Sequence, residues 1–410
     1  MISRVKTTAF VFISICIGSL FSVIAIELFL RLRFGRSMDL QMEMFKYAKY
    51  LKVGTGGVLP GHRHRPYSKR HLMGVDVHID KEGNRRTLNP ARGDLNSSVF
   101  DIVLVGDSFT MGWGVDESHT FSSLISKYAN AVAANCDPGY YFNVTNMGVG
   151  NYNSMQSYAL LSSKRRKISA NLLVLVHFVN DAESYKFSSA GFWERESYFY
   201  NFISSRLSRK NTLPYHHYYS SLYDQPDWSG NKQALLKLRQ LAKELTGRDL
   251  IVFLLPELRE ISRDNKLKNA YKAREEFFRF NQFEYFNTMG ILRDASGGYP
   301  ESLWVSPADS HSNKKANIAL SRFMFDKIMP EVLPSKCLAK AENLDPLICP
   351  HCGGQMRFLA VIEEPPVIER ILDQIGEWCP SPPPRAPPAE QEWPKGCQIP
   401  LSYHRVPDIA

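Results

Sequence analysis

The sequence contains no concentrated run of basic residues. Its net charge is +9 over 410 residues, and its densest basic cluster is the short "SSKRRKIS" at 162–169. Proteins that bind nucleic acids usually gather their positive charge on one face or arm of the molecule. We therefore interpret this cluster as a solvated helix end, and we expect no nucleic-acid partner.

Cysteine is scarce through most of the chain. Five of the seven cysteines lie near its end, at Cys337, Cys349, Cys352, Cys379 and Cys397. This distribution forms no disulfide framework and does not identify a redox compartment. Between residues 99 and 333 no His, Cys, Asp or Glu residues have the spacing of metal ligands. We therefore expect neither a metal nor a cofactor in that region.

A long apolar run is present at the N-terminus. Residues 9–26 carry no charge, and apolar residues resume at Leu28, so the run reaches about 22 residues, enough to cross a bilayer. A cleaved signal peptide usually has a shorter apolar region that ends at small residues. We interpret residues 1–35 as an uncleaved, single-pass anchor in the cell membrane.

The flanking charges do not settle the orientation of this anchor. Arg4 and Lys6 precede the span, and Arg31, Arg33 and Arg36 follow it. Because positive charge favours the cytoplasmic side, this pattern does not support an outside position for the rest of the chain. We nevertheless expect the following domain on the extracytoplasmic side, and the orientation stays open.

Apolar strands alternate with helices from about Asp101 onward. Strands are predicted at "DIVLVGD", "YFNVTNMG", "NLLVLVHFVND" and "DLIVFLLPE", and helices at "TFSSLISKYANAVAA", "SMQSYALLSSKR", "NKQALLKLRQLAKELTG" and "NKKANIALSRFMFDKIM". This alternation predicts an α/β fold, a parallel sheet covered by helices on both faces. We assign residues 99–333 to this domain and residues 36–98 to a linker and lead-in segment, with a short strand in "GVDVHID".

One serine stands at the edge of this predicted sheet. Ser108 follows the first strand in a turn that contains Gly106, Gly112 and Gly114. Ligands of open α/β sheets bind beyond the carboxyl ends of the strands. The alternative is that Ser108 only caps the next helix, since serine is favoured there. A nucleophilic serine needs a base, so the rest of the chain decides between the two interpretations.

The stretch "WVSPADSHSNKKANIAL" supplies a base. It places Asp309 and His311 on a predicted loop directly before the last helix. An imidazole there can accept the proton of Ser108, while the carboxylate fixes its tautomer and stabilises the imidazolium. His177 is the competing histidine, but it lies inside an apolar strand, and we interpret it as a core residue.

Four blocks of this sequence resemble the conserved blocks of the SGNH/GDSL hydrolase superfamily. They are "GDSFTMGWGV", "NMGVGNYNSMQ", "HFVND" and "DSHSN", in the order and approximate spacing of that family, over residues of about 75–333. The resemblance implies a three-layer, flavodoxin-like α/β fold and hydrolysis or transfer of an ester-linked acyl group. It implies that Ser108 is the nucleophile, His311 the base and Asp309 its orienting acid.

The resemblance also implies an oxyanion hole. Its donors would be the backbone N–H of Ser108, the side chain of Asn180 and a backbone N–H of the second block, at Gly150 or Asn151. Where the family usually has Asn-x-Gly-x-x-Gly, this chain has "NMGVGN", so Asn151 replaces the glycine. A backbone donor needs no glycine, and asparagine tolerates left-handed geometry, so the turn keeps the role. A weakened enzyme or an inactive relative remains the alternative.

Residues 334–410 follow a different pattern. Pro330 and Pro334 are expected to end the last helix. The "CPHCGGQM" stretch has a CxxC pair without the second pair that a structural zinc site needs, and "SPPPRAPPAEQEWP" is rich in proline. Residues of about 345–400 resemble the C-terminal end of transposases from rolling-circle insertion sequences, which implies a chimeric reading frame. The alternative is an accessory zinc domain.

The sequence therefore predicts a membrane-anchored serine esterase or O-acyltransferase. Its substrate would be an acylated small molecule, glycan or lipid of the cell envelope. The alternatives are a non-catalytic, carbohydrate-binding relative of the fold, and a zinc- and DNA-binding protein led by its tail. Hydrolase and transferase differ only in which acceptor reaches the acyl-enzyme, so the sequence does not separate them.

Overall fold

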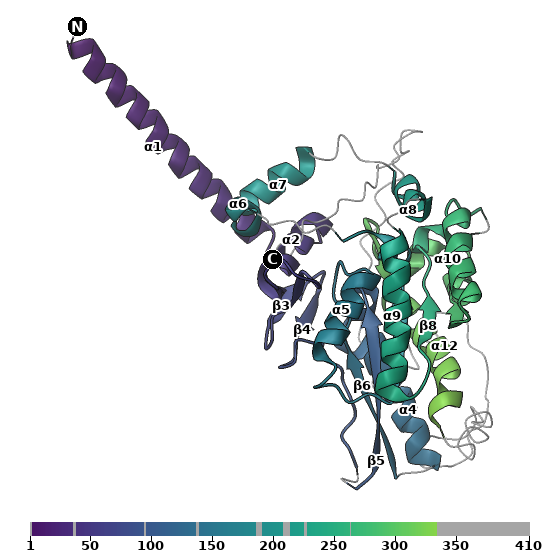
Figure 1. Cartoon of the computed structure of the whole chain (residues 1–410). Coiled ribbons are helices and arrows are strands. Elements are labelled where there is room, and N and C mark those ends of the chain that lie inside the picture. Colours follow the sequence, from purple (N-terminus) through teal and green to yellow (C-terminus); the bar gives the residue numbers. More distant parts are fainter. Residues whose placement is uncertain are drawn as a thin grey trace, which may run out of the picture. The chain divides into compact units, whose positions relative to one another are not determined.

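The computed structural model describes most of the chain before residue 334 (Figure 1). The described residues are 2–35, 38–93, 96–136, 139–185, 191–207, 214–224, 228–262 and 264–333. The chain divides into two compact units. One consists of Met1–Leu338 and Leu401–Ala410 and contains all the described residues; the other is Ala339–Pro400. The predicted tail, with its CxxC pair and proline-rich stretch, lies outside the described residues.

A five-stranded sheet lies at the centre of this unit, and all its neighbouring strands are parallel. Its order is β6 (Tyr140–Asn146), β5 (Ser98–Gly106), β7 (Leu172–His177), β8 (Ile251–Leu254) and β9 (Glu284–Asn287). All six residues of β7 are buried, as expected of a central strand with both faces covered. The predicted α/β fold with a parallel sheet is confirmed, and β9 is an additional strand.

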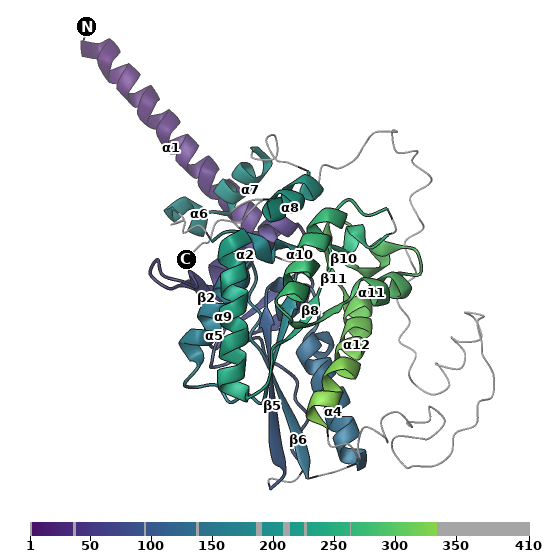
Figure 2. The same cartoon turned by 45° about the vertical axis from the view of Figure 1, so that its right-hand side comes forward.

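Helices cover both faces of this sheet (Figures 1 and 2). The ring of His177 in β7 contacts Trp228 and Phe278, and the ring of Phe253 in β8 contacts Phe323. One layer contains α5 (Ser154–Lys164), α9 (Trp228–Thr246) and α10 (Lys268–Phe280). The other contains α4 (Phe121–Cys136), α11 (Met289–Ser296) and α12 (Lys314–Val332). Helix α12 includes Pro330 and continues two residues beyond it, because a proline in the last turn removes only one late hydrogen bond.

Hairpins and further helices lie outside this sheet and its two helical layers. Three antiparallel hairpins pair β1 (Lys52–Gly54) with β2 (His62–His64), β3 (Lys69–Leu72) with β4 (Val75–His78), and β10 (Trp304–Ser306) with β11 (Asp309–Ser312). The remaining α-helices are α1 (Ile2–Arg33), α2 (Leu40–Leu51), α3 (Ser108–Met111), α6 (Phe192–Glu196), α7 (Tyr198–Leu207) and α8 (Tyr215–Asp224).

Helix α1 is the one described helix that is long and apolar enough to cross a membrane. This stretch is Phe10–Arg33; its most apolar 18 residues are not buried against the rest of the protein, whereas Leu30 near its end is buried. Near its end, the Glu27 carboxylate accepts hydrogen bonds from the backbone N–H groups of Tyr198 and Phe199, at 3.0 and 2.8 Å. The first turn of α7 is thereby capped by a residue of the apolar helix. Membrane anchors and signal sequences share this length and composition.

The segment expected as a linker and lead-in packs against residues of the predicted catalytic domain. Tyr47 and Leu51 of α2, with Leu72 before the β3–β4 turn, form one buried cluster with Met111 and Trp113 of the predicted catalytic domain. Buried apolar side chains of this kind dominate the free energy of folding. Residues 38–93 therefore contribute to the core beside Ser108 and are not a loose connection.

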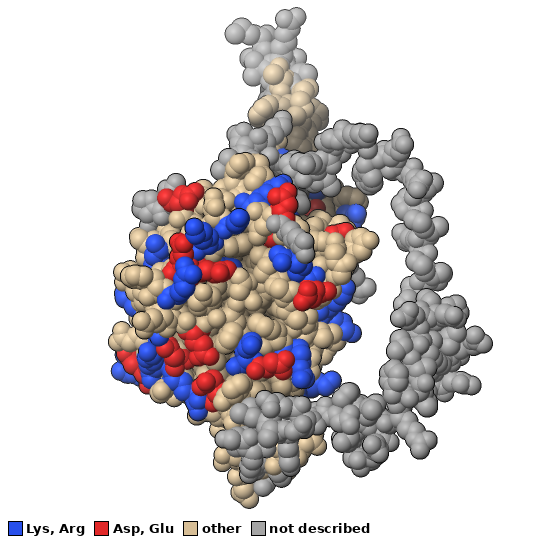
Figure 3. Space-filling view, turned by 90° about the vertical axis from the view of Figure 1, so that its right-hand side faces the viewer, with Lys and Arg blue, Asp and Glu red and all other residues tan. Residues whose placement is uncertain are grey.

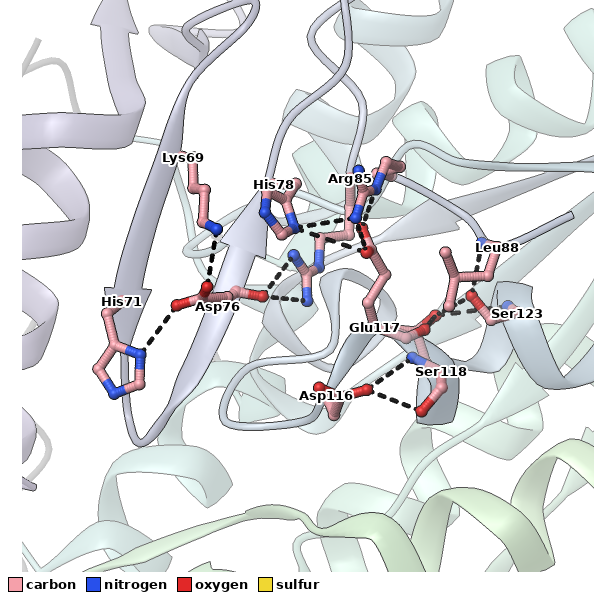
Figure 4. A network of polar contacts seen from close by, with 12 residues as sticks. Lys69, His71, Asp76, His78, Arg85, Leu88, Asp116, Glu117, Ser118 and Ser123 are labelled. Atoms are coloured by element: carbon pink, nitrogen blue, oxygen red, sulfur yellow. Dashed lines mark hydrogen bonds and ion pairs between the residues drawn. The ribbon is translucent and has the colours of Figure 1, made fainter.

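A polar network holds the β3–β4 hairpin against the domain (Figure 4). The Asp76 carboxylate accepts from Lys69 Nζ at 2.8 Å and from His71 Nδ1 at 2.9 Å, within the hairpin. Arg86 pairs with Glu117, which lies in the 3-10 turn Glu117–His119 before α4, and the Arg86 Nη2 atom also lies 3.3 Å from Nδ1 of His78 in β4. Glu117 is buried, and such paired, partly buried charges fix one arrangement of the segments that carry them.

Charge is dispersed over the face that Figure 3 shows, where Lys and Arg are interspersed with Asp and Glu. Several surface pairs are local, such as Arg322 with Asp326 at 3.3 Å along α12 and Lys272 with Glu276 at 3.8 Å along α10. Exposed pairs of this kind contribute little to stability. On that face the net charge of +9 does not gather into a stripe.

Candidate active site

Ser108 stands where β5 passes into the short helix α3. Strand β5 ends at Gly106, and the Asp107 carboxylate accepts the N–H of Phe109 at 2.9 Å, so Asp107 is the N-cap of α3. A Cβ atom on Gly106 (φ +153°) would lie 2.2 Å from Thr110 Oγ1, so the turn needs glycine here. Ser108 is not the cap, and its hydroxyl is free for another partner.

That partner is His311. Ser108 Oγ lies 2.8 Å from His311 Nε2, and His311 Nδ1 lies 2.5 Å from Asp309 Oδ1. The three residues that the sequence nominated therefore form one continuous hydrogen-bonded chain, although Ser108 and His311 are 203 positions apart. An arrangement of this kind lets the imidazole accept the serine proton while the carboxylate holds the other ring nitrogen.

Asp309 and His311 lie on a strand and not on the predicted loop. Both belong to β11, which pairs with β10 in an antiparallel hairpin before α12. Residues two apart in a strand share one face, which brings the carboxylate and the imidazole together. Ser310 points the other way, and its hydroxyl donates to Glu257 Oε1 at 2.6 Å. The hairpin thus fixes the geometry of both catalytic candidates.

The pKa values of this pair move in opposite directions. Burial alone would lower the pKa of His311, but the negative charge and the hydrogen bond of Asp309 outweigh it, so the pKa lies above the usual 6.5. Burial alone would raise the pKa of Asp309, but the imidazole and the hydrogen bonds it accepts hold it below 3.8. The pair therefore favours a carboxylate beside an imidazole that readily holds a proton.

Trp113 is a supporting residue that the sequence analysis did not identify. Its Nε1–H donates to Asp309 Oδ2 at 2.8 Å, which satisfies the second oxygen of a carboxylate that is 2% exposed. Its indole also packs edge-on against the Tyr47 ring, with centroids 5.6 Å apart. Trp113 lies in the "GDSFTMGWGV" block, but an aromatic residue beside glycines also suits a core position, so the local pattern did not reveal this bond.

Two of the predicted oxyanion donors are unengaged. Asn180 lies in the 3-10 turn Val179–Ala182 directly after β7, and its Oδ1 atom is buried without a hydrogen-bond partner. Among the described residues, neither the backbone N–H of Ser108 nor the side-chain amide of Asn180 donates a hydrogen bond. Both residues line the same cavity. These groups are therefore available to a ligand oxygen at the carboxyl ends of β5 and β7.

The second block differs from the expectation at Gly150. Its backbone N–H donates to the Tyr47 hydroxyl at 2.8 Å, so this donor is not available to an oxyanion. A Cβ atom at Gly150 would lie 2.7 Å from the Tyr47 ring, which explains why glycine stands one place early. Asn151 adopts the left-handed conformation (φ 68°), and its side-chain oxygen accepts from Lys52 Nζ at 2.9 Å. Of the two residues predicted to supply a backbone donor in this turn, Asn151 therefore stays the candidate.

These groups open into one cavity that holds about 930 Å³ of empty space, part of it open to solvent. Its walls are mostly apolar and aromatic. Residues of α2 form one side of the cavity and residues of α8 form another. Besides the catalytic candidates, the lining residues include Leu40, Met44, Tyr47, Phe178, Tyr215, Tyr219 and Arg259. Cavities lined in this way, with a few convergent polar groups, are typical ligand sites.

His177 lies in the core, as the sequence predicted. It is fully buried between Trp228 and Phe278, and neither ring nitrogen has a hydrogen-bond partner. Burial, together with the charge of Arg274, holds its pKa well below 6.5, so the ring is neutral. His177 is therefore not a second candidate for the base. In the described part of the chain no group of three His, Cys, Asp or Glu residues is placed to hold a metal ion.

Comparison with known proteins gives similarity to solved structures only. No family model matches the sequence, and no curated protein matches it. A two-domain esterase active on acetylated mannans is 12% identical with a TM-score of 0.35, and the match covers 58% of this chain and 51% of that one. The chain thus spans about half the length of that protein.

Two shorter structures are covered almost completely. A lipase/acylhydrolase from Enterococcus faecalis is 16% identical with a TM-score of 0.36, over 58% of this chain and 98% of that one. An acetyl-xylooligosaccharide esterase from Geobacillus is 13% identical with a TM-score of 0.35, over 57% of this chain and 95% of that one. At these scores the similarity does not decide what this chain does. The chemistry has to be argued from its own side chains.

Proposed function

We propose that this protein is a serine hydrolase of the SGNH/GDSL type that cleaves or transfers an ester-linked acyl group. The observation that carries the proposal is the hydrogen-bonded chain from Ser108 through His311 to Asp309, with Ser108 facing a cavity. A buried carboxylate, an imidazole and a serine in this order activate the serine as a nucleophile. A carbohydrate-binding relative without catalytic activity would not need the 2.8 Å contact between Ser108 and His311.

The reaction follows from the positions of these groups. Ser108 Oγ forms a bond to the ester carbonyl carbon while its proton moves to His311 Nε2. The negative charge that develops on the carbonyl oxygen is stabilised by the N–H groups of Ser108 and Asn151 and by the Asn180 amide. The carbon–oxygen bond to the alcohol then breaks, and His311 returns the proton to the leaving alcohol. Water or a second hydroxyl takes the acyl group by the reverse steps.

The membrane part of the proposal rests on α1. We propose that Phe10–Arg33 anchors the protein and that the catalytic unit acts outside the cytoplasm on an acylated glycan or lipid of the cell envelope. Glu27, near the end of this helix, holds α7. Helix α2, which follows α1, provides Leu40, Met44 and Tyr47 to the cavity. The cavity is therefore built partly from the segment next to the membrane.

The test is turnover of 4-nitrophenyl acetate, butyrate and longer-chain esters by the full chain in detergent. We expect hydrolysis by the parent, and loss of at least 1000-fold in kcat for Ser108→Ala, as removal of a nucleophile implies. Ser163→Ala is the matched control, because that hydroxyl is exposed on α5 and bonds only within its own helix, to Leu160 O. Equal rates for the parent and Ser108→Ala would refute the assignment.

A further inference from the structure

The side chain of one arginine lines the cavity without donating a hydrogen bond to any described residue. Arg259 lies in the 3-10 turn Leu258–Glu260 that follows β8, and its side chain is 16% exposed. Its Nε atom is buried without a hydrogen-bond partner. In the described part of the chain none of its other guanidinium N–H groups donates a hydrogen bond either. A guanidinium carries five N–H donors, and here the Nε donor is buried unpaired, which costs free energy that a ligand acceptor would recover.

The neighbours of Arg259 leave these donors free. Glu257 Oε1 forms an ion pair with Arg259 Nε at 3.7 Å, which is beyond hydrogen-bond distance. This oxygen already accepts from Ser310 Oγ at 2.6 Å and from the backbone N–H of Arg259 at 3.3 Å. The guanidinium lies over the Tyr215 ring, 4.8 Å from its centroid. Stacking covers a face of the guanidinium and leaves its edge, where the N–H groups point outward. The Glu257 carboxylate and the Tyr215 ring thus hold the Arg259 guanidinium in place.

We propose that Arg259 forms an anion subsite in the active-site cavity and that it binds a carboxylate on the ester substrate. The inference rests on the proposed function, because it names a group on the substrate of Ser108. A planar guanidinium edge matches a carboxylate in a two-point hydrogen bond. A singly charged group is favoured over a phosphate monoester, which carries nearly two charges, since Glu257 and Asp309 also line the cavity.

Other charged groups around the cavity are already paired. Asp309 is bonded to His311 and Trp113, and Glu257 to Ser310. Both carboxylates are almost fully buried, at 2% and 1% exposure. Arg259 is therefore the cation that an incoming carboxylate would meet. The alternative, that Arg259 only neutralises Glu257, predicts equal effects on charged and neutral substrates when it is replaced.

The experiment uses two pairs of esters that differ in one charge. The first pair, mono-4-nitrophenyl adipate and its methyl ester, places a carboxylate on the acyl side. The second, 4-carboxyphenyl acetate and its methyl ester, places it on the alcohol side. We expect the preference in kcat/KM for the charged member of one pair to fall about 10- to 100-fold in Arg259→Met, the loss expected for a charge-assisted hydrogen bond. Comparing each ratio between parent and variant cancels differences in leaving group.

Two controls separate an anion subsite from a structural role. Arg322→Met removes the same charge from an exposed position on α12 and should leave both ratios unchanged. Arg259→Lys keeps the charge but not the fork, and should retain part of the preference. A charge preference that is absent in both pairs, or that survives in Arg259→Met, would overturn the proposal.

A binding measurement keeps this result separate from the proposed function. The affinity of Ser108→Ala for each ester, measured by calorimetry, requires no turnover. We expect the charged member of the same pair to bind about 10-fold more weakly when Arg259→Met is added. If the parent hydrolyses no ester, the proposed function fails, and the calorimetry alone tests the anion subsite. Equal affinities for the charged ester with and without Arg259→Met would refute the anion subsite.

Discussion

Replacing Tyr47 by phenylalanine tests whether α2 belongs to the catalytic machinery. The Tyr47 hydroxyl accepts the N–H of Gly150 at 2.8 Å and lies 2.7 Å from His64 Nε2. Burial raises the pKa of Tyr47 and lowers the pKa of His64 to about 3, so both groups are neutral and the hydroxyl donates to the imidazole. The substitution removes one oxygen and leaves two buried polar partners without it.

The size of the effect follows from these two partners. A buried polar group that loses its partner costs about 1–3 kcal/mol, so with two such groups Tyr47→Phe should lower the free energy of unfolding by roughly 2–6 kcal/mol. The turn that carries Asn151 also loses its fixed position. Loss of an oxyanion donor costs about 100- to 1000-fold in kcat. A displaced donor should cost part of this, about 10- to 100-fold, with little change in KM.

Urea unfolding followed by circular dichroism gives the first quantity, and 4-nitrophenyl acetate hydrolysis gives the second. Tyr50→Phe is the matched control, because it removes a hydroxyl from the same helix. The Tyr50 hydroxyl makes only a long, part-buried contact of 3.4 Å with the Tyr198 hydroxyl. A Tyr47→Phe protein with the stability and kcat of the parent would refute the role of α2. A change confined to KM would instead indicate that Tyr47 acts on substrate binding.

Three further predictions concern the base, the oxyanion hole and the last helix. Because the pKa of His311 is raised above 6.5 and only the neutral imidazole accepts a proton, kcat/KM for an uncharged ester should rise with pH through a midpoint above 6.5. Asp309→Asn should move that midpoint down, and an unchanged midpoint would contradict the assignment. Asn180→Ala should lower kcat far more than it raises KM, since an oxyanion donor acts in the transition state; an effect on KM alone would argue for substrate positioning. A chain that ends near Ser335 should keep the parent's thermal midpoint. One that ends at Ser312 should fail to fold because it lacks α12 and its buried face; equal midpoints for the two would exclude α12 from the core.

The parts of the fold that the sequence predicted are those with strong local patterns. Strands β5 to β8 are apolar runs bounded by polar residues, and α4, α9 and α12 have apolar residues at helical spacing. Strand β9 was missed because its residues, "EYFN", are only half-buried and have no apolar run. The β10–β11 hairpin was missed because its strands are three and four residues long and largely polar.

The residues of the candidate site were likewise predicted only where a local sequence pattern indicated them. Ser108, His311 and Asp309 were nominated because each lies in a block with a recognisable order of polar residues. Tyr47 and Gly150 are 103 positions apart, and nothing near Tyr47 in the sequence indicates that it supports a turn of another segment. Such contacts depend on the packing of α2, which no local pattern encodes. The same reasoning applies to Trp113 and Arg259, whose partners are fixed by tertiary structure.

The central claim is that Ser108 is a nucleophile activated by His311. Its most direct test is the reaction of the full chain with a fluorophosphonate, followed by mass spectrometry of the peptides. We predict one adduct, on the peptide that contains Ser108, which is absent in Ser108→Ala and forms at least 100-fold more slowly in His311→Ala. An adduct on another residue, or a labelling rate that His311→Ala does not change, would contradict the claim.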